Sequence, residues 1–242
     1  IPPGERHYAV AGAEVIEKAA DAIRNAKRPL LLIGAGANRK EARRAISECI
    51  ARIGVPFCNT QMGKGVVDES SNYFLGTAAL SDKDYMHDYV KRADLIVNIG
   101  HDVVEKPPFF MEHGGTRVIH INYKSAQVDQ VYFPQIEVVG DIALSVDALA
   151  DALGSRLDLN LTEFEMVRDN VKDKVFRLAD ETTFPMQPQN IVAEIRNLMG
   201  YHDIIALDNG VYKIWFARNY LAYQPNTILL DNALVTMGAG LP

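Results

Sequence analysis

The sequence has little cysteine, no long apolar run and no metal-binding spacing, and each shortage excludes a class of protein. Two cysteines cannot form a disulfide framework, so Cys49 and Cys58 are predicted to be small core residues in a reducing compartment. No apolar segment approaches the roughly 20 residues that a membrane span needs. The six histidines show no H-E-x-x-H or C-x-x-C partner spacing, so no metal site built by this chain alone is expected.

A cluster of basic residues is missing as well. Lysine and arginine number 25 against 31 acidic residues, they are scattered, and the formal net charge is -6. This balance argues against a nucleic-acid surface, and we expect no membrane partner either. The contents of 48% hydrophobic and 23% charged residues are those of an ordinary globular protein, expected in the cytoplasm. The first residues, IPPGERHYAV, carry no secretion signal and resemble the inside of a longer protein.

What is present is a glycine turn around which the first two thirds of the chain is arranged. Leu30–Ile33 is an unbroken apolar run, as expected of a strand buried on both faces of a parallel sheet. Gly34, Ala35 and Gly36 follow, and a helical apolar period begins at Asn38. Strand, turn and helix form the opening half of a βαβ unit. Its backbone N–H groups could hold a phosphate, or the glycines could simply allow a tight turn.

As a dinucleotide fingerprint, this turn is incomplete. Arg39 stands where G-x-G-x-x-G needs its last glycine, and no carboxylate lies near Pro56–Thr60, where the ribose-binding acid belongs. The sequence therefore does not favour a nicotinamide-dependent dehydrogenase. Further along, Lys64 lies in a loop at the carboxyl end of a strand, where it could meet a phosphate, although an exposed loop lysine is more often merely solvated.

Strands and helices alternate over residues 11–153. This pattern predicts an α/β fold with a doubly wound, Rossmann-like parallel sheet of at least five strands and helices on both faces. The expected strands are 30–33, 55–59, 94–100, 117–122 and 136–139, and the expected helices are 11–26, 38–53, 84–92 and 142–153. His101 and Asp102 follow a strand and are interpreted as a cofactor contact or a plain loop. The apolar run 107–111 is expected to pack on another domain or subunit.

The composition divides the chain into three parts. Residues 1–153 are the predicted central domain and residues 154–184 a polar linker with a helix at 162–179, begun by a capping box of Thr162 and Glu165. Residues 185–242 are predicted to begin a second α/β domain, with a helix near 191–199, a strand at 203–207, another helix and a strand at 227–230. Because these few helices and strands cannot bury a core, the second domain is expected to be truncated.

Several short motifs in order resemble one enzyme family. They are LLIGAG at 31–36, GVPFCNTQMGKG at 54–65, ADLIVNIG at 93–100, VIHIN at 118–122, VVGD at 138–141, DNG at 208–210 and TMGAGLP at 236–242. Together they are similar to the middle domain and the start of the C-terminal domain of thiamine-diphosphate-dependent enzymes. Within that family the resemblance is strongest to the acetolactate synthase (acetohydroxyacid synthase) large subunit.

The resemblance implies an activity for the intact protein. It would decarboxylate pyruvate on thiamine diphosphate with Mg²⁺ and join the enamine to a second 2-oxo acid, in branched-chain amino acid or acetoin synthesis, as a homodimer or homotetramer. The catalytic glutamate and the magnesium-binding G-D-G…N segment of the family are not in this sequence, so no catalytic or metal-binding residue is assigned here and the fragment alone is expected to be inactive. Alternatives are a pyruvate oxidase-like, benzoylformate decarboxylase-like or benzaldehyde lyase-like enzyme, a non-catalytic nucleotide-binding module, or a structural scaffold.

The resemblance also assigns cofactor contacts. Asn209, Gly210 and the residues after them would approach the diphosphate, Val235 would offer its carbonyl to the aminopyrimidine, and Met237 would press between the two rings. Biosynthetic members of the family bind FAD in the middle domain, although Asp102 stands here where their arginine pairs with the flavin diphosphate. The positions matching that FAD site are Gly34, Ala35, Gly36, Thr60, Gln61, Gly100, Asn122, Asp141 and Ile142.

Overall fold

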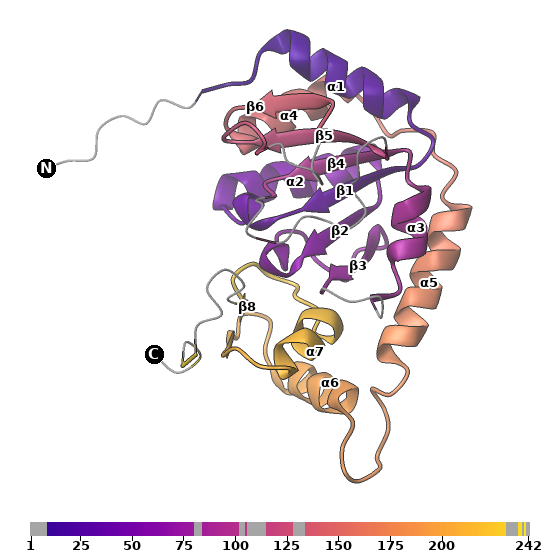
Figure 1. The fold of residues 1–242 in the computed structure, drawn as a ribbon, viewed down its shortest axis with the longest axis vertical. Coiled ribbons are helices and arrows are strands. Elements are labelled where there is room, and N and C mark those ends of the chain that lie inside the picture. The colour runs from indigo at the N-terminus through magenta and orange to yellow at the C-terminus, as the bar shows by residue number, and fades with distance from the viewer. Residues whose placement is uncertain are drawn as a thin grey trace, which may run out of the picture.

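The computed structural model describes residues 9–79, 84–101, 105, 115–127, 134–230, 237–238 and 240. Its main body is a six-stranded sheet in the order β3-β2-β1-β4-β5-β6 (Figure 1). The strands are β1 (Pro29–Ile33), β2 (Phe57–Thr60), β3 (Phe74–Ala78), β4 (Leu95–Ile99), β5 (Arg117–Asn122) and β6 (Ile136–Val139). Every neighbouring pair is parallel, which confirms the predicted doubly wound sheet.

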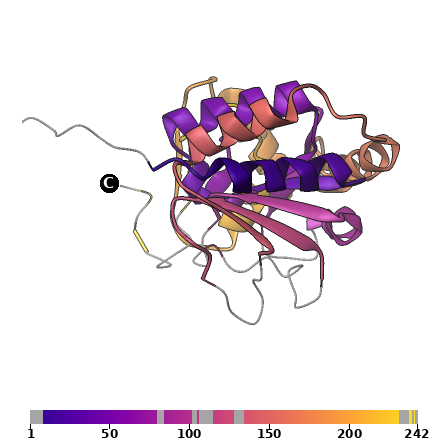
Figure 2. The same cartoon turned by 90° about the horizontal axis from the view of Figure 1, so that it is seen from above.

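Helices cover both faces because the buried strands present alternate residues to opposite sides. Leu31 and Ile33 of β1 pack with α1 (Ala13–Asn25), α2 (Lys40–Ile53) and α4 (Ile142–Leu153), and Figure 2 shows these helices together on one side of the sheet. Leu30 and Leu32 face the other side, toward α3 (His87–Arg92) and α5 (Thr162–Phe176). The central sheet is therefore apolar on both faces, as the unbroken apolar runs indicate.

The helix in the predicted linker is part of this packing. Phe164, Val171 and Val175 of α5 are buried in the core of the second face, and the Phe164 ring lies 5.4 Å from that of Tyr89, measured between ring centroids. The predicted capping box is wrong: α5 has no side-chain cap, and the Thr162 amide donates instead to Asn160 Oδ1. This helix thus covers the sheet as well as connecting the two parts of the chain.

The second unit contains a short parallel sheet of β7 (Ile205–Leu207) and β8 (Ile228–Leu230), with α6 (Pro188–Leu198) and α7 (Tyr212–Asn219) beside it. Its small core joins the first unit, because Ala79, just after β3, packs with buried Tyr220 and Ala222. Figure 1 shows this unit below the β3 edge of the main sheet. Within the described part of the chain, none of the helices has the length and apolarity to cross a membrane.

Candidate functional site

The sheet changes winding direction between β1 and β4, and the loops that follow these two strands are in close contact. The Gly34 amide donates to Ile99 O at 2.9 Å, and the Gly36 amide donates to Gly100 O at 2.7 Å. A Cβ on Gly100, whose φ is +69°, would lie 2.4 Å from Ala37 N. The crevice outside such a switch point is where open α/β sheets bind ligands. Here, the two glycine loops fill the space between the strand ends with backbone.

A carboxylate from the same chain completes this turn. The Ala35 amide donates to Glu105 Oε1 at 2.9 Å, and the Thr60 hydroxyl donates to Glu105 Oε2. The Ala37 amide returns to Gly34 O at 3.1 Å, so the successive amides of residues 34–37 all donate to acceptors within the protein. The α-helix α2 does not begin until Lys40, because a 3₁₀ turn at residues 35–37 intervenes. The backbone amides of the predicted phosphate-binding turn are therefore already hydrogen-bonded to groups of this protein.

The remaining predicted flavin contacts lie at the carboxyl ends of β2, β5 and β6, and most of them hold the loops in place. The Asn122 side chain donates to His101 O at 2.9 Å, and Asp141 caps α4 by accepting from Leu144 N at 3.0 Å. Ile142 is fully buried at the start of that helix. Gln61 differs from these: it is buried, and neither its amide oxygen nor its amide nitrogen has a hydrogen-bond partner among the described residues.

A second candidate site lies where β7 ends. The Gly238 amide lies 2.8 Å from both carboxylate oxygens of Asp208, and Asn209 Nδ2 lies 3.8 Å from Met237 Sδ. A Cβ on Gly240 would lie 2.9 Å from Asp208 N, so this glycine is required for the close approach. The fold therefore brings together the DNG and TMG motifs, which are 28 residues apart in sequence. Val235 lies outside the described residues, as do Asp102 and the 107–111 run.

Asp208 is the residue of this site that sequence reasoning did not assign. Its carboxylate holds the two segments together, and its position directly before Asn209 and Gly210 at a strand end was the available signal. Met237 is 73% exposed, so its thioether remains available for contact. The described residues contain no cluster of three His, Cys, Asp or Glu side chains that could hold a metal ion.

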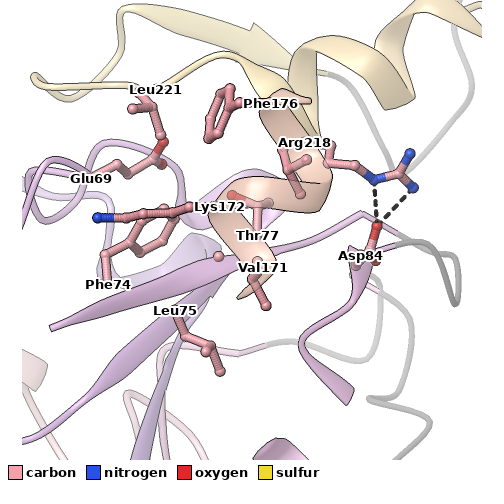
Figure 3. A pocket seen from close by; sticks show the side chains of 12 residues that line it. Glu69, Phe74, Leu75, Thr77, Asp84, Val171, Lys172, Phe176, Arg218 and Leu221 are labelled. Atoms are coloured by element: carbon pink, nitrogen blue, oxygen red, sulfur yellow. Dashed lines mark hydrogen bonds and ion pairs between the residues drawn. The ribbon is translucent and has the colours of Figure 1, made fainter. Parts of the chain in front are cut away.

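The junction between the two units contains a cavity of about 280 Å³ bordered by β3, α5 and α7 (Figure 3). Its walls are mostly apolar and include Phe74, Leu75 and Phe176. At one end, the Arg218 guanidinium binds Asp84 Oδ1 through Nε at 2.9 Å and Nη2 at 2.8 Å, and Figure 3 shows both bonds. The other carboxylate oxygen of Asp84 accepts from Ala79 N at 2.8 Å. The sequence carried no signal for this cavity.

Lys64 lies near the cavity rather than in solvent. It is only 3% exposed, and its ammonium group binds Glu69 Oε2 at 2.7 Å and Thr77 Oγ1 at 3.2 Å. Both expectations for this lysine, a phosphate contact and a solvated loop, are therefore wrong. The predicted burial of Cys49 and Cys58 is confirmed, and desolvation raises the pKa of each thiol to about 12.

These features define an α/β protein of the doubly wound class, in which a two-stranded parallel unit follows the six-stranded main sheet. The family described as "Thiamine pyrophosphate enzyme, central domain" matches residues 16–149, a segment that contains all six strands of the main sheet. The chain belongs to this family.

Curated relatives cover nearly the whole chain. It is 28% identical over 240 residues to the acetolactate synthase of Bacillus subtilis (strain 168), covering 96% of this chain and 41% of that protein. It is also 28% identical over 233 residues to the catabolic acetolactate synthase of Raoultella terrigena, covering 94% and 41%. A probable acetolactate synthase large subunit of Methanococcus aeolicus is 24% identical over 243 residues, covering 94% and 41%. The chain thus spans about two fifths of the length of these relatives.

Proposed function

We propose that the intact protein carrying this chain is a thiamine-diphosphate-dependent carboligase of the acetolactate synthase type. It decarboxylates pyruvate and joins the two-carbon unit to a second 2-oxo acid, in branched-chain amino acid or acetoin synthesis. The observation that carries this proposal is the contact of Asp208 with Gly238 and of Asn209 with Met237 at the carboxyl end of a parallel strand pair. The similarity to acetolactate synthases along 94–96% of the chain supports it.

The residues of this site fit thiamine diphosphate. Gly210 lies shortly after β7, where a Cβ would meet the Tyr212 ring at 2.4 Å, so its own backbone is the group proposed to approach the diphosphate, and Asn209 adds a polar amide beside it. Met237 offers a flexible apolar thioether that can pack against the cofactor rings, and Val235 remains a proposed carbonyl partner of the aminopyrimidine. When bound, the cofactor supplies an electron sink for decarboxylation, while this chain binds and orients it and excludes water.

The other parts of the proposal concern the whole protein. Magnesium is proposed to be held largely by residues outside this chain, because the family's G-D-G…N segment is not in this sequence. A homodimer or homotetramer in the cytoplasm is proposed. Flavin is not included, because the carboxylate of Glu105 lies on the turn that would have to receive its diphosphate.

The test compares the intact protein with the 242-residue chain. Each is supplied with pyruvate, thiamine diphosphate and Mg²⁺, and acetolactate is measured. The intact protein should form acetolactate, and the 242-residue chain should form none. An intact protein that consumes pyruvate without forming acetolactate would instead favour an oxidase or a simple decarboxylase on the same scaffold. Turnover by the chain alone would contradict the assignment of essential groups to other domains.

A further inference from the structure

The Glu105 carboxylate occupies the position in the glycine turn where an external anion would be expected. In doubly wound folds, the N–H groups after the first strand bind a phosphate at the switch point. Here, Glu105 Oε1 accepts from Ala35 N at 2.9 Å, and Oε2 accepts from the Thr60 hydroxyl. The glutamate is only 7% exposed, so this carboxylate is held inside the crevice rather than over it.

The glycine that opens the turn makes room for these internal groups. A Cβ on Gly34 would lie 2.6 Å from the Cα of His101 and 2.8 Å from Glu105 Oε1. On Gly36, a Cβ would lie 2.8 Å from Gly100 O. Both contacts are to this chain, so the absence of side chains at Gly34 and Gly36 is used to admit the loop after β4. The two glycines therefore leave no open space for a phosphate.

The negative charge of Glu105 opposes diphosphate binding, as does the close packing at Gly34 and Gly36. A diphosphate bound here would have to share the Ala35 amide with a buried carboxylate, and two anions at hydrogen-bonding distance from one donor repel each other strongly in a poorly solvated crevice.

We propose that Glu105 is a built-in anion that replaces the phosphate at the switch point and closes the central domain to flavin and other diphosphate-containing nucleotides. The glycine turn is then a structural clamp between β1, β2 and β4, linked through Ala35 and Thr60. This inference concerns the central domain alone and does not depend on the carboligase function.

The experiment measures binding of FAD and ADP to the chain by isothermal titration calorimetry and by quenching of flavin fluorescence. The test variant is Glu105→Ala, which removes the carboxylate. The matched control is Glu137→Ala, which removes a carboxylate that also accepts a backbone amide, that of Ala126 at 2.6 Å, but on the edge strand β6. Circular dichroism confirms that each variant is folded.

We expect the unaltered chain and Glu137→Ala to bind neither ligand measurably up to millimolar concentration. Glu105→Ala should bind ADP or FAD with a dissociation constant of about 0.1 mM or below, which is a gain of at least tenfold. Micromolar FAD binding by the unaltered chain would overturn the proposal, and so would a folded Glu105→Ala chain without any gain. If Glu105→Ala does not fold, Glu105→Ser is measured against the same criterion, since serine retains a polar group but removes the anion.

Discussion

Lys64 Nζ lies 2.7 Å from Glu69 Oε2, and both side chains are almost completely shielded from solvent. Glu69 also accepts from Asn59 Nδ2 at 2.8 Å and from the Ala222 amide at 2.8 Å. This one carboxylate therefore connects β2, the loop after it and the chain leaving α7. Such a network is costly to interrupt, because removing one charge leaves its partner buried and uncompensated.

Glu69→Gln should accordingly lower the free energy of unfolding by about 3–5 kcal/mol. Urea unfolding followed by circular dichroism measures this change. Glu14→Gln is the matched control, because Glu14 forms an ion pair with Lys18 on the exposed surface of α1 and its loss should leave the unfolding midpoint unchanged. A Glu69→Gln chain as stable as the unaltered one would show that the buried pair contributes nothing to the junction.

The Asp84–Arg218 pair should couple the two units. Both side chains are buried and joined by two hydrogen bonds from one guanidinium. A double-mutant cycle with Asp84→Asn and Arg218→Gln should give a coupling energy of about 1–3 kcal/mol. Hydrogen exchange should show faster exchange in α7 for Arg218→Gln, while α2 stays protected. Equal acceleration in both helices would mean that the pair supports the whole fold rather than this junction.

The buried cysteines should make the protein less stable at alkaline pH. Their pKa is raised to about 12 in the folded chain, whereas an unfolded thiol ionises near pH 8.5. Stability contributed by a neutral thiol is full below pH 8.5 and is lost as pH rises toward the folded pKa. Ionisation of each thiol in the unfolded chain should lower the free energy of unfolding by about 2 kcal/mol between pH 8.5 and 10.

Urea unfolding of Cys58→Ala at pH 7.5 and pH 10 tests this expectation. Since alanine does not ionise, the variant should lose about 2 kcal/mol less than the unaltered chain between the two values. Identical pH slopes for the two proteins would contradict it. Native thiols should also resist a thiol reagent at pH 8 until denaturant is added.

Gly100 should be much less tolerant of alanine than another glycine of similar φ. Gly100→Ala places a Cβ 2.4 Å from Ala37 N, which is a backbone atom. This substitution should lower the free energy of unfolding by about 2–4 kcal/mol. Gly54 has φ +72° at the end of α2, and its Cβ would meet only side-chain ends at 3.2 Å or more. Gly54→Ala should cost about 1 kcal/mol, which is the left-handed backbone strain alone. Thermal and urea unfolding of both variants checks the ranking, and equal losses would contradict it.

In the intact protein, Met237→Ala should lower kcat more than it weakens binding of thiamine diphosphate. The proposed diphosphate contacts near Gly210 remain, whereas the thioether that is proposed to position the rings is lost. Steady-state kinetics with varied cofactor separates the two effects, and Met166→Ala, on the exposed surface of α5, is the control. A variant with normal kcat that only needs more cofactor would contradict the role of Met237.

The pattern of apolar residues along the sequence was sufficient to predict most strands of the main sheet. The apolar run Leu30–Ile33 and its counterparts predicted five of the strands of the main sheet, because strands buried on both faces need continuous apolar residues. The edge strand β3 was not predicted. It is a short strand at the border of the sheet that contains Gly76, and its neighbours, rather than its own composition, make it a strand.

The sites depended on contacts between distant residues. The resemblance of the motifs predicts that Asn209, Gly210 and Met237 contact thiamine diphosphate, and it predicts flavin contacts for Gly34, Gly100 and Asn122. Whether a donor there is open or already satisfied depends on side chains arriving from elsewhere, since a hydrogen-bond donor can be saturated by a group many residues away. Thus Glu105 fills the glycine turn and Glu69 neutralises buried Lys64. Only the tertiary structure brings either carboxylate to its partner.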